Sequence, residues 1–338
     1  MELIFFGNGA TNFGDDLNAI IWKRVFPSWV FDIKDVALVG IGTVFTDQWT
    51  NSPRIQNKRV FVLGSGAGYW PLPRDYKSWT LLALRGPLSA ALVEQPALAA
   101  TDAAALLAVL PALVPKREKA NRILFMPHHG SIPGAHWQKV AEAAGMTFVD
   151  PSWSTETILQ HYAEAKLVLA EAMHGAIVAD TLRIPWIPWA ASPHLLPFKW
   201  IDWTMSLNLQ YRPTLLPPTS TWGKWRHSIA QYKSRRAGIK PSLQTLAMSE
   251  PTTLIEDFRT RYSGTFVPKR KSQKMLHSTL RRTVIHTSKF FDRGDIGPAA
   301  EAVTQLAKQQ PYLSNDQSLQ NGVARLQEAA DKLVRILQ

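Results

Sequence analysis

Short apolar runs of strand length alternate with segments of helical periodicity along much of this chain. The runs expected to form strands are Leu3–Phe6, Val36–Gly40, Val60–Gly64, Thr80–Leu84, Ile123–Met126, Thr147–Val149 and Lys166–Ala170. The segments expected to form helices are Asp15–Arg24, Gly86–Val93, Gly134–Ala144, Thr155–Ala165 and Gly175–Arg183. Strands that alternate with helices form parallel sheets with right-handed crossover connections. The sequence therefore predicts an α/β fold with two Rossmann-like domains that face each other across a cleft.

The boundary between these domains is expected in a segment rich in proline and charge, PALVPKREKANR at residues 111–122. We place the N-terminal Rossmann-like domain at residues 1–115 and the C-terminal one at residues 116–223. The alternation weakens past Pro213. Residues 224–298 are expected to form a basic, loop-rich segment, and residues 299–338 to form helices at Glu301–Leu306 and Ser318–Leu337.

The formal net charge of +12 is confined to one stretch of the chain. Residues 224–293 hold sixteen Lys and Arg against four Asp and Glu, so the rest of the 338 residues is balanced. A local basic block on a neutral body favours contact with an anionic surface at one face over nucleic-acid binding. A solvated basic loop is the alternative.

Cysteine is absent, which excludes disulfides and thiolate metal sites. The N-terminal residues have no basic region and no apolar run of signal-peptide length. No apolar run in the sequence approaches the roughly eighteen residues that a membrane-spanning helix needs. We therefore expect a cytoplasmic protein.

His174 lies where an expected strand gives way to an expected helix. In an open α/β sheet, ligands bind in the crevice outside the carboxyl ends of the strands. A histidine at such a junction is a candidate acid or base, because the unperturbed pKa of histidine side chains lies near neutrality.

Two cations occupy comparable places in the sequence. Arg85 ends an apolar strand directly before a helix, where its planar fork suits a carboxylate or a phosphate. Lys199 stands among aromatic residues, 25 residues after His174. The alternatives are an arginine that ties a loop together and a lysine that extends along an amphipathic helix to solvent.

A loop with two glycines, NGATNFGDDLN at residues 8–18, follows the first expected strand. Asp15 and Asp16 would repel a phosphate in this loop, so sugar hydroxyls, which donate hydrogen bonds to carboxylates, fit better. Asn12 is expected to bind the same sugar. A plain capped loop is the alternative. His128 and His129 end another strand, and neighbours on an extended chain point to opposite sides. The sequence predicts no metal site.

Seven segments occur in an order that resembles the polysaccharide pyruvyl transferases, in particular the bacterial exopolysaccharide ketal-pyruvate branch. They cover about residues 1–210 and are TNFGDDLN, GIGTVF, LRGPLSA, ATDAAALL, LFMPHH, AEAMHGAIVADTLRIPWIPW and KWIDWTMSL. The resemblance implies a glycosyltransferase-B-like pair of domains, with the acceptor side on residues 1–115 and the donor side on residues 116–223. It also implies transfer of a pyruvyl group from phosphoenolpyruvate onto two hydroxyls of a sugar. Many members have Arg-Leu before the motif histidine; Ala172 and Met173 stand there here.

We therefore expect a ketal-pyruvate transferase in which His174, Arg85 and Lys199 are catalytic, and in which these three residues and Gly175 bind the donor. The residues expected to hold the acceptor, a lipid-linked oligosaccharide, are Asn12, Asp15, Asp16, His128 and His129. The residues expected to face the anionic inner surface of the plasma membrane are Lys269, Arg270, Lys271 and Lys274. Phosphoenolpyruvate is the co-substrate, and the scheme requires neither metal nor redox cofactor. The alternatives are a nucleotide-sugar glycosyltransferase and a non-catalytic glycan- or nucleic-acid-binding protein.

Overall fold

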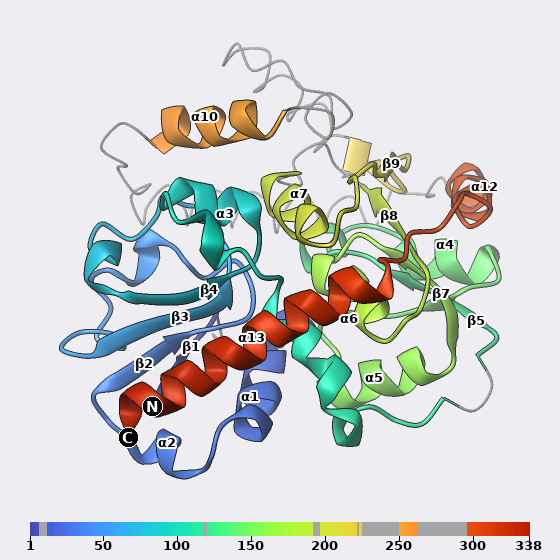
Figure 1. Cartoon of the computed structure of the whole chain (residues 1–338). Coiled ribbons are helices and arrows are strands. Elements are labelled where there is room, and N and C mark those ends of the chain that lie inside the picture. The colour runs from blue at the N-terminus through green and yellow to red at the C-terminus, as the bar shows by residue number, and fades with distance from the viewer. Residues whose placement is uncertain (7–11, 118–119, 192–196, 222, 225–249, 263–295) are drawn as a thin grey trace.

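The strands form two separate parallel sheets, one in each half of the molecule (Figure 1). The computed structural model describes residues 1–6, 12–117, 120–191, 197–221, 223–224, 250–262 and 296–338. The N-terminal half contains β1 (Glu2–Ile4), β2 (Val36–Val39), β3 (Arg59–Ser65) and β4 (Thr80–Leu84) in the order β1-β2-β3-β4. The C-terminal half contains β5 (Arg122–Met126), β6 (Thr147–Phe148), β7 (Ala165–Ala170), β8 (Trp186–Ala190) and β9 (Thr214–Leu215) in the order β6-β5-β7-β8-β9. The expected α/β class with two parallel sheets is confirmed, and the sheets are consistent with Rossmann-like folds.

Helices flank both sheets, and several of their bounds differ from the expected ones. They are α1 (Phe13–Val25), α2 (Trp29–Asp32), α3 (Pro87–Leu92), α4 (Trp137–Ala143), α5 (Thr155–Ala163), α6 (Met173–Thr181), α7 (Pro197–Ser206), α10 (Pro251–Tyr262), α12 (Ile296–Leu306) and α13 (Asp316–Leu337). The expectation that a helix starts at Gly175 is wrong, because α6 begins two residues earlier. His174 therefore belongs to the first turn of α6, where backbone N–H groups lack helical partners.

The described segments that connect β2, β3 and β4 contain short 3₁₀ turns in place of α-helices. A longer 3₁₀ segment, η4 (Ala103–Val109), follows α3 and runs between the two halves. It contacts α1, α6 and α13, and five of its residues, Ala103 to Leu107, are buried.

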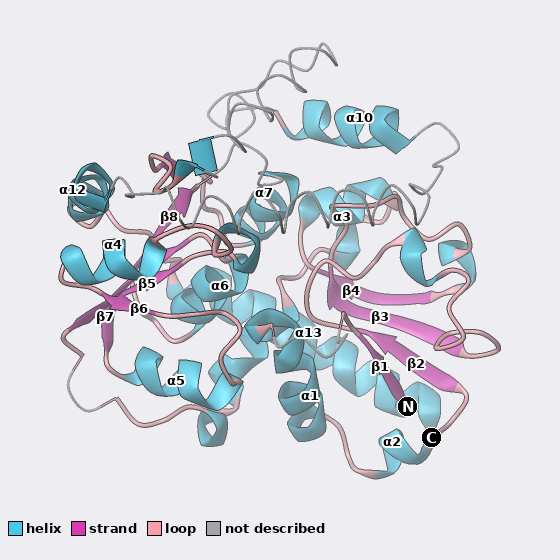
Figure 2. Ribbon diagram, turned by 180° about the vertical axis from the view of Figure 1, so that it is seen from behind, coloured by secondary structure: helices cyan, strands magenta, loops and turns pink. Residues whose placement is uncertain are grey.

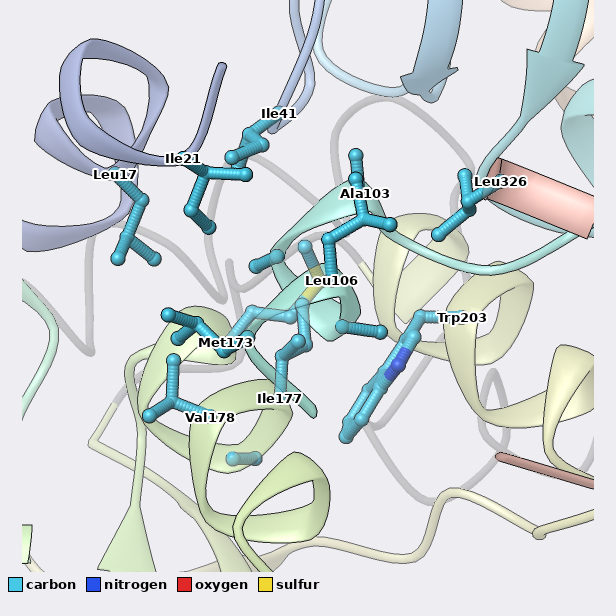
Figure 3. Close-up of a cluster of buried hydrophobic side chains, with 14 of the residues drawn as sticks. Leu17, Ile21, Ile41, Ala103, Leu106, Met173, Ile177, Val178, Trp203 and Leu326 are labelled. Atoms are coloured by element: carbon cyan, nitrogen blue, oxygen red, sulfur yellow. The ribbon is translucent and has the colours of Figure 1, made fainter. Parts of the chain in front are cut away.

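One hydrophobic core extends through both halves (Figure 3). Leu17 and Ile21 of α1 enter it from the N-terminal half, and Ile177 of α6 enters it from the C-terminal half. Leu106 of η4 lies among them. Because apolar surface from both halves is removed from water in the same cluster, the halves stabilise each other.

The C-terminal helices pack against both halves of the molecule (Figure 2). Helix α12 lies on α4, where Val303 joins a cluster with Phe125 and Trp189 in the C-terminal half. Helix α13 crosses back and packs on β3, β4 and η4, burying Val323, Leu326 and Leu333 among others. The segment 299–338 thus contributes to the cores on both sides, and the domain boundaries stay predictions.

A fully buried ion pair joins the halves. Arg85, directly after β4, donates from Nε to Asp202 Oδ2 of α7 over 3.0 Å, and neither side chain is exposed. Asp202 also accepts hydrogen bonds from the backbone N–H and the hydroxyl of Ser89 in α3. A Cβ on Gly86 would lie 1.9 Å from the carbonyl oxygen of Asp202, so only glycine allows α7 to approach this closely.

This ion pair predicts a large loss of stability on removal of one partner. Asp202→Ala leaves the Arg85 guanidinium buried without its counter-charge, so we expect the free energy of unfolding to fall by about 3–5 kcal/mol. Urea unfolding followed by circular dichroism measures this change. The double variant Arg85→Met with Asp202→Ala is the matched control, and it should recover much of the loss because no unpaired charge remains. A loss under about 1 kcal/mol for Asp202→Ala would contradict the prediction.

Candidate active site

His174 is held close to the C-terminal sheet by tight packing behind it. The next residue, Gly175, lies so near β5 that a Cβ there would be 2.7 Å from the sulfur of Met126. The buried Tyr162 of α5 donates its hydroxyl to the carbonyl of Gly175 over 2.8 Å. Gly175 thus fixes the first turn of α6, and the donor contact expected of it stays a prediction.

The imidazole of His174 reaches across to the N-terminal half. A Cβ on Gly14 in α1 would lie 1.8 Å from His174 Nδ1, so any other residue at position 14 would collide with the ring. A Cβ on Gly42, in the turn after β2, would lie 3.7 Å from both His174 Cε1 and Asp15 Oδ1. Gly14 therefore makes room for the ring, and Gly42 lies beside both the ring and Asp15. The side chain of His174 is 16% exposed, so it is accessible from one side.

Asp15 belongs to the first turn of α1, as expected, and its environment is unusual. Burial raises the pKa of Asp15 to about 6, although the positive charges of His174 and Lys199 and a hydrogen bond from Asn12 act in the opposite direction. Asn12 donates to Asp15 from Nδ2 over 2.8 Å, and its backbone N–H donates to Asp16 over 3.1 Å. Three of the five expected acceptor residues are therefore joined in one local network.

Lys199 lies on α7, and its side chain is almost completely buried, with 6% exposed. The alternative of a lysine that extends into solvent is therefore wrong. Its ammonium lies 4.9 Å from the centroid of the Tyr69 ring, a cation–π contact. In the described part of the chain, no carboxylate lies within ion-pair distance of this ammonium. A buried cation without a counter-ion is costly, so this position favours an anionic ligand.

Arg85, also expected at the donor, is wholly buried and bonded to protein groups. Besides Asp202, its guanidinium donates to the Thr43 hydroxyl over 2.9 Å and to the Ala67 carbonyl over 2.7 Å. Gly68 follows, and a Cβ there would lie 2.6 Å from Thr43 Cγ2 and 3.8 Å from Lys199 Cβ. Arg85 thus holds the loops around Lys199, and direct donor binding by it stays a prediction.

Asp102 was not identified as a site residue from the sequence. It precedes η4, and its Oδ1 accepts a hydrogen bond from the backbone N–H of Ala104 over 3.0 Å. The same oxygen lies 3.8 Å from His174 Nε2, and Asp102 is completely buried. An aspartate before a helical segment is read as a cap. Only the fold places it beside the histidine.

His128 and His129 follow β5, as expected, but their rings do not point to opposite sides. The ring centroids are 4.1 Å apart, because a 3₁₀ turn begins at His129 and the chain is no longer extended there. The backbone N–H of His128 donates to Glu171 Oε2, and Oε1 of the same buried carboxylate accepts from Ala191 N–H. Glu171 thereby joins the loops after β5 and β8. Acceptor binding by the two histidines stays a prediction.

The four expected membrane-facing residues, Lys269, Arg270, Lys271 and Lys274, lie outside the described residues. Helix α10, from the same basic stretch, packs on α3, and its Phe258 contacts Phe198 of α7 at 5.2 Å between ring centroids. No helix among the described residues has the length and apolarity that crossing a membrane requires.

The arrangement combines an imidazole, a carboxyl group whose pKa lies near 6, and a buried ammonium. The imidazole and the carboxyl group can exchange protons with a substrate, and the ammonium can bind an anion. In the described part of the chain, no group of three or more His, Asp or Glu side chains is placed to hold a metal ion.

The raised pKa of Asp15 predicts a pH-dependent penalty on stability. Between about pH 4 and pH 6 the folded protein keeps a proton on Asp15 that the unfolded chain has released, so the free energy of unfolding falls as pH rises. Asp15→Asn removes this penalty. We expect the variant to exceed the wild type in stability above pH 6, by at most about 3 kcal/mol, and to match it below about pH 4.

Urea unfolding of both proteins across this pH range measures the difference. Asp16→Asn is the control, because burial raises the pKa of Asp16 in the same direction but by less, so its pH-dependent effect on stability should be smaller. A difference between Asp15→Asn and wild type that is constant with pH would contradict the prediction.

Comparisons with known proteins identify one protein that is similar to part of this chain. No protein-family model matches the chain, and no solved structure matches it. The succinoglycan biosynthesis protein ExoV of Rhizobium meliloti (strain 1021) is 37% identical to it over 209 residues. The match covers 61% of this chain and 65% of that protein. The chain is thus similar, over somewhat less than two thirds of either length, to a protein of succinoglycan biosynthesis.

Proposed function

We propose that this chain is a ketal-pyruvate transferase of exopolysaccharide biosynthesis. It moves the pyruvyl group of phosphoenolpyruvate onto two hydroxyls of a sugar in a lipid-linked repeat unit and releases phosphate. The similarity to a succinoglycan biosynthesis protein supports the process. The motif order of the sequence supports the reaction, and the two parallel sheets agree with a glycosyltransferase-B-like arrangement.

The single observation that carries the proposal is the buried ammonium of Lys199, which has no carboxylate partner among the described residues. Phosphoenolpyruvate bears a carboxylate and a phosphate on one small frame, so its pocket needs a fixed cation. Lys199 also lies close enough to Asp15 for its charge to lower the pKa of that carboxyl group. The cation and the acid–base pair therefore serve the same ligand.

The reaction balances with one acid and one base. The methylene carbon of phosphoenolpyruvate gains a proton from the imidazolium of His174, which leaves an oxocarbenium-like centre at the adjacent carbon. The first sugar hydroxyl attacks this centre and gives its proton to the Asp15 carboxylate. The second hydroxyl closes the ring as the C–O bond to phosphate breaks, and its proton leaves with the phosphate. Proton return from Asp15 to His174 restores the site, and no net proton is consumed.

This scheme predicts separate effects of two substitutions. His174→Ala removes the proton donor, so we expect turnover to fall by about 10²-fold or more. The affinity of the His174→Ala variant for phosphoenolpyruvate should differ little from that of the wild type. Lys199→Ala removes a charge-assisted contact, so we expect donor affinity to fall by about tenfold to a hundredfold. Calorimetry with phosphoenolpyruvate and phosphate release with a panel of hexosides measure the two effects.

Lys139→Ala, on the exposed face of α4, is the matched control for Lys199→Ala and should leave donor binding unchanged. Binding of a UDP-sugar with UDP release, in place of phosphoenolpyruvate binding, would identify a nucleotide-sugar glycosyltransferase. Binding of a glycan without turnover of either donor would identify a non-catalytic protein. Either result would overturn the proposal.

We propose further that the protein acts in the cytoplasm, on the inner face of the plasma membrane, through its basic stretch. Each Lys or Arg near an anionic surface contributes about 1 kcal/mol, and salt screens this attraction within about 10 Å at 0.1 M. Neutralising Lys269, Arg270, Lys271 and Lys274 together should therefore reduce sedimentation with phosphatidylserine-containing liposomes. High salt should have the same effect on the wild type.

Activity on a short water-soluble acceptor should stay near that of the wild type, because the site residues lie elsewhere in the chain. Neutralising Lys23, Arg24, Lys34 and Lys77, outside the basic stretch, is the control and should leave sedimentation unchanged. Wild-type protein that ignores anionic liposomes at low salt would contradict membrane contact.

A further inference from the structure

The carboxylate of Asp102 is buried without the partners that such a group usually has. Neither of its oxygens is exposed, and Oδ2 accepts no hydrogen bond from any residue that the structure describes. Oδ1 accepts one, from the backbone N–H of Ala104. A carboxylate accepts up to four hydrogen bonds, and a buried one with a single donor carries an uncompensated charge.

The nearest cation-forming group is the imidazole of His174. Its Nε2 lies 3.8 Å from Asp102 Oδ1, is itself buried, and has no hydrogen-bond partner among the described residues. This distance is about 1 Å longer than a charge-assisted hydrogen bond. A displacement of about 1 Å would bring the two atoms to that distance. Nε2, which has no partner, thus faces a carboxylate that accepts a single hydrogen bond, across the junction between the halves.

We propose that Asp102 is a positioning residue that holds His174 with the proton on Nε2, so that Nδ1 is the nitrogen that exchanges protons with the substrate. The part of the imidazole away from Nε2 is the part that a substrate would reach. Nε2 is buried while 16% of the side chain is exposed, so the exposed part of the ring lies away from Nε2. Nδ1 packs against Gly14 of α1, where a Cβ would lie 1.8 Å from it, and both Cε1 and Asp15 Oδ1 lie 3.7 Å from the position of a Cβ on Gly42. The charged groups that act on the ring come from two elements, with Asp102 at η4 and Asp15 on α1, and Lys199 of α7 acts in turn on Asp15.

A carboxylate in this place acts in two ways. A hydrogen bond from Nε2–H fixes the tautomer and the orientation of the ring, as carboxylates do for histidines in other sites. Its negative charge stabilises the imidazolium that forms when His174 takes a proton. Because Asp102 and His174 belong to different halves, the contact also requires that the halves keep their relative position.

Asp102→Asn separates this role from capping. Asparagine caps helices about as well as aspartate does, so the Ala104 contact and the melting temperature should be retained. The amide, however, has no negative charge and can present its N–H₂ to Nε2, which favours the proton on Nδ1. Asp150→Asn is the matched control, because Asp150 accepts a similar local bond from the backbone N–H of Ser152.

The first readout is the tautomer of His174, measured by ¹⁵N NMR and assigned with a His174→Gln variant. We expect the Nε2–H tautomer in the wild type and in Asp150→Asn, and the Nδ1–H tautomer in Asp102→Asn. A wild type with the proton on Nδ1, or a tautomer that Asp102→Asn leaves unchanged, would overturn the inference. This readout requires no substrate, so its failure is distinct from failure of the proposed function on which the catalytic role rests.

The second readout is catalysis. We expect Asp102→Asn to lower kcat by about 10- to 100-fold, as the loss of a group that orients a functional histidine does elsewhere. The dissociation constant for phosphoenolpyruvate should stay within about twofold of the wild-type value, because Lys199 is untouched. A kcat within threefold of wild type, or a loss confined to donor affinity, would remove Asp102 from the mechanism.

Discussion

The buried ion pair between Arg85 and Asp202 determines where the groups of the site lie. Asp202 stands on α7 three residues after Lys199, so fixing Asp202 against α3 also fixes the helix turn that carries Lys199. The other nitrogens of Arg85 hold Thr43 and Ala67 in the loops after β2 and β3. The desolvation of both charges is expensive, and the hydrogen bonds to Ser89, Thr43 and Ala67 offset that cost. The same contacts make the N-terminal half and α7 one rigid unit around the buried ammonium.

A second constraint acts at His174, where the approach of the halves depends on residues without side chains. Gly14 leaves space for the imidazole, and Gly175 allows α6 to lie against Met126 of β5. The close approach excludes solvent from Nε2 and from Asp102, while 16% of the His174 side chain remains exposed. An acid–base group needs one side that is shielded from water and another side that is accessible, and the His174 ring has both. Electrostatic interactions are stronger where water is absent, and the exposed part of the ring remains open to solvent.

Local patterns were sufficient to predict the parts of the fold that depend on neighbouring residues. The strands β2 to β5 and β7 lie where apolar runs predicted them, and His174 lies just past the carboxyl end of β7. The partner of Arg85 could not be predicted, because Asp202 is 117 residues away and an arginine at a strand end fits a ligand equally well. The role of Asp102 was hidden for the same reason. A capping aspartate has an adequate local explanation, and its proximity to His174 arises only when η4 packs between the halves.

The path of α13 and the turn at His129 show two further limits of local patterns. The apolar spacing of α13 predicted a helix but not that the helix returns to β3 and β4, since an apolar face does not specify its partner. The rings of His128 and His129 lie together because the strand ends before them, and strand ends are set by tertiary contacts such as the bond from His128 N–H to Glu171. Strand periodicity applied to that pair therefore gave the wrong geometry.

Tyr69 connects the basic stretch with the site. Tyr262 ends α10 and donates its hydroxyl to the carbonyl of Tyr69 over 2.7 Å, while the ring of Tyr69 lies over the ammonium of Lys199. Helix α10 lies beside α3 and α7 in both views of the molecule (Figures 1 and 2). The stretch that holds the entire net charge is thus attached next to the buried cation of the site. Docking of that stretch on an anionic surface would place the site close to the surface. A sugar tethered to a lipid would then reach the site without leaving the membrane, and the protein would need no spanning helix to remain near its substrate.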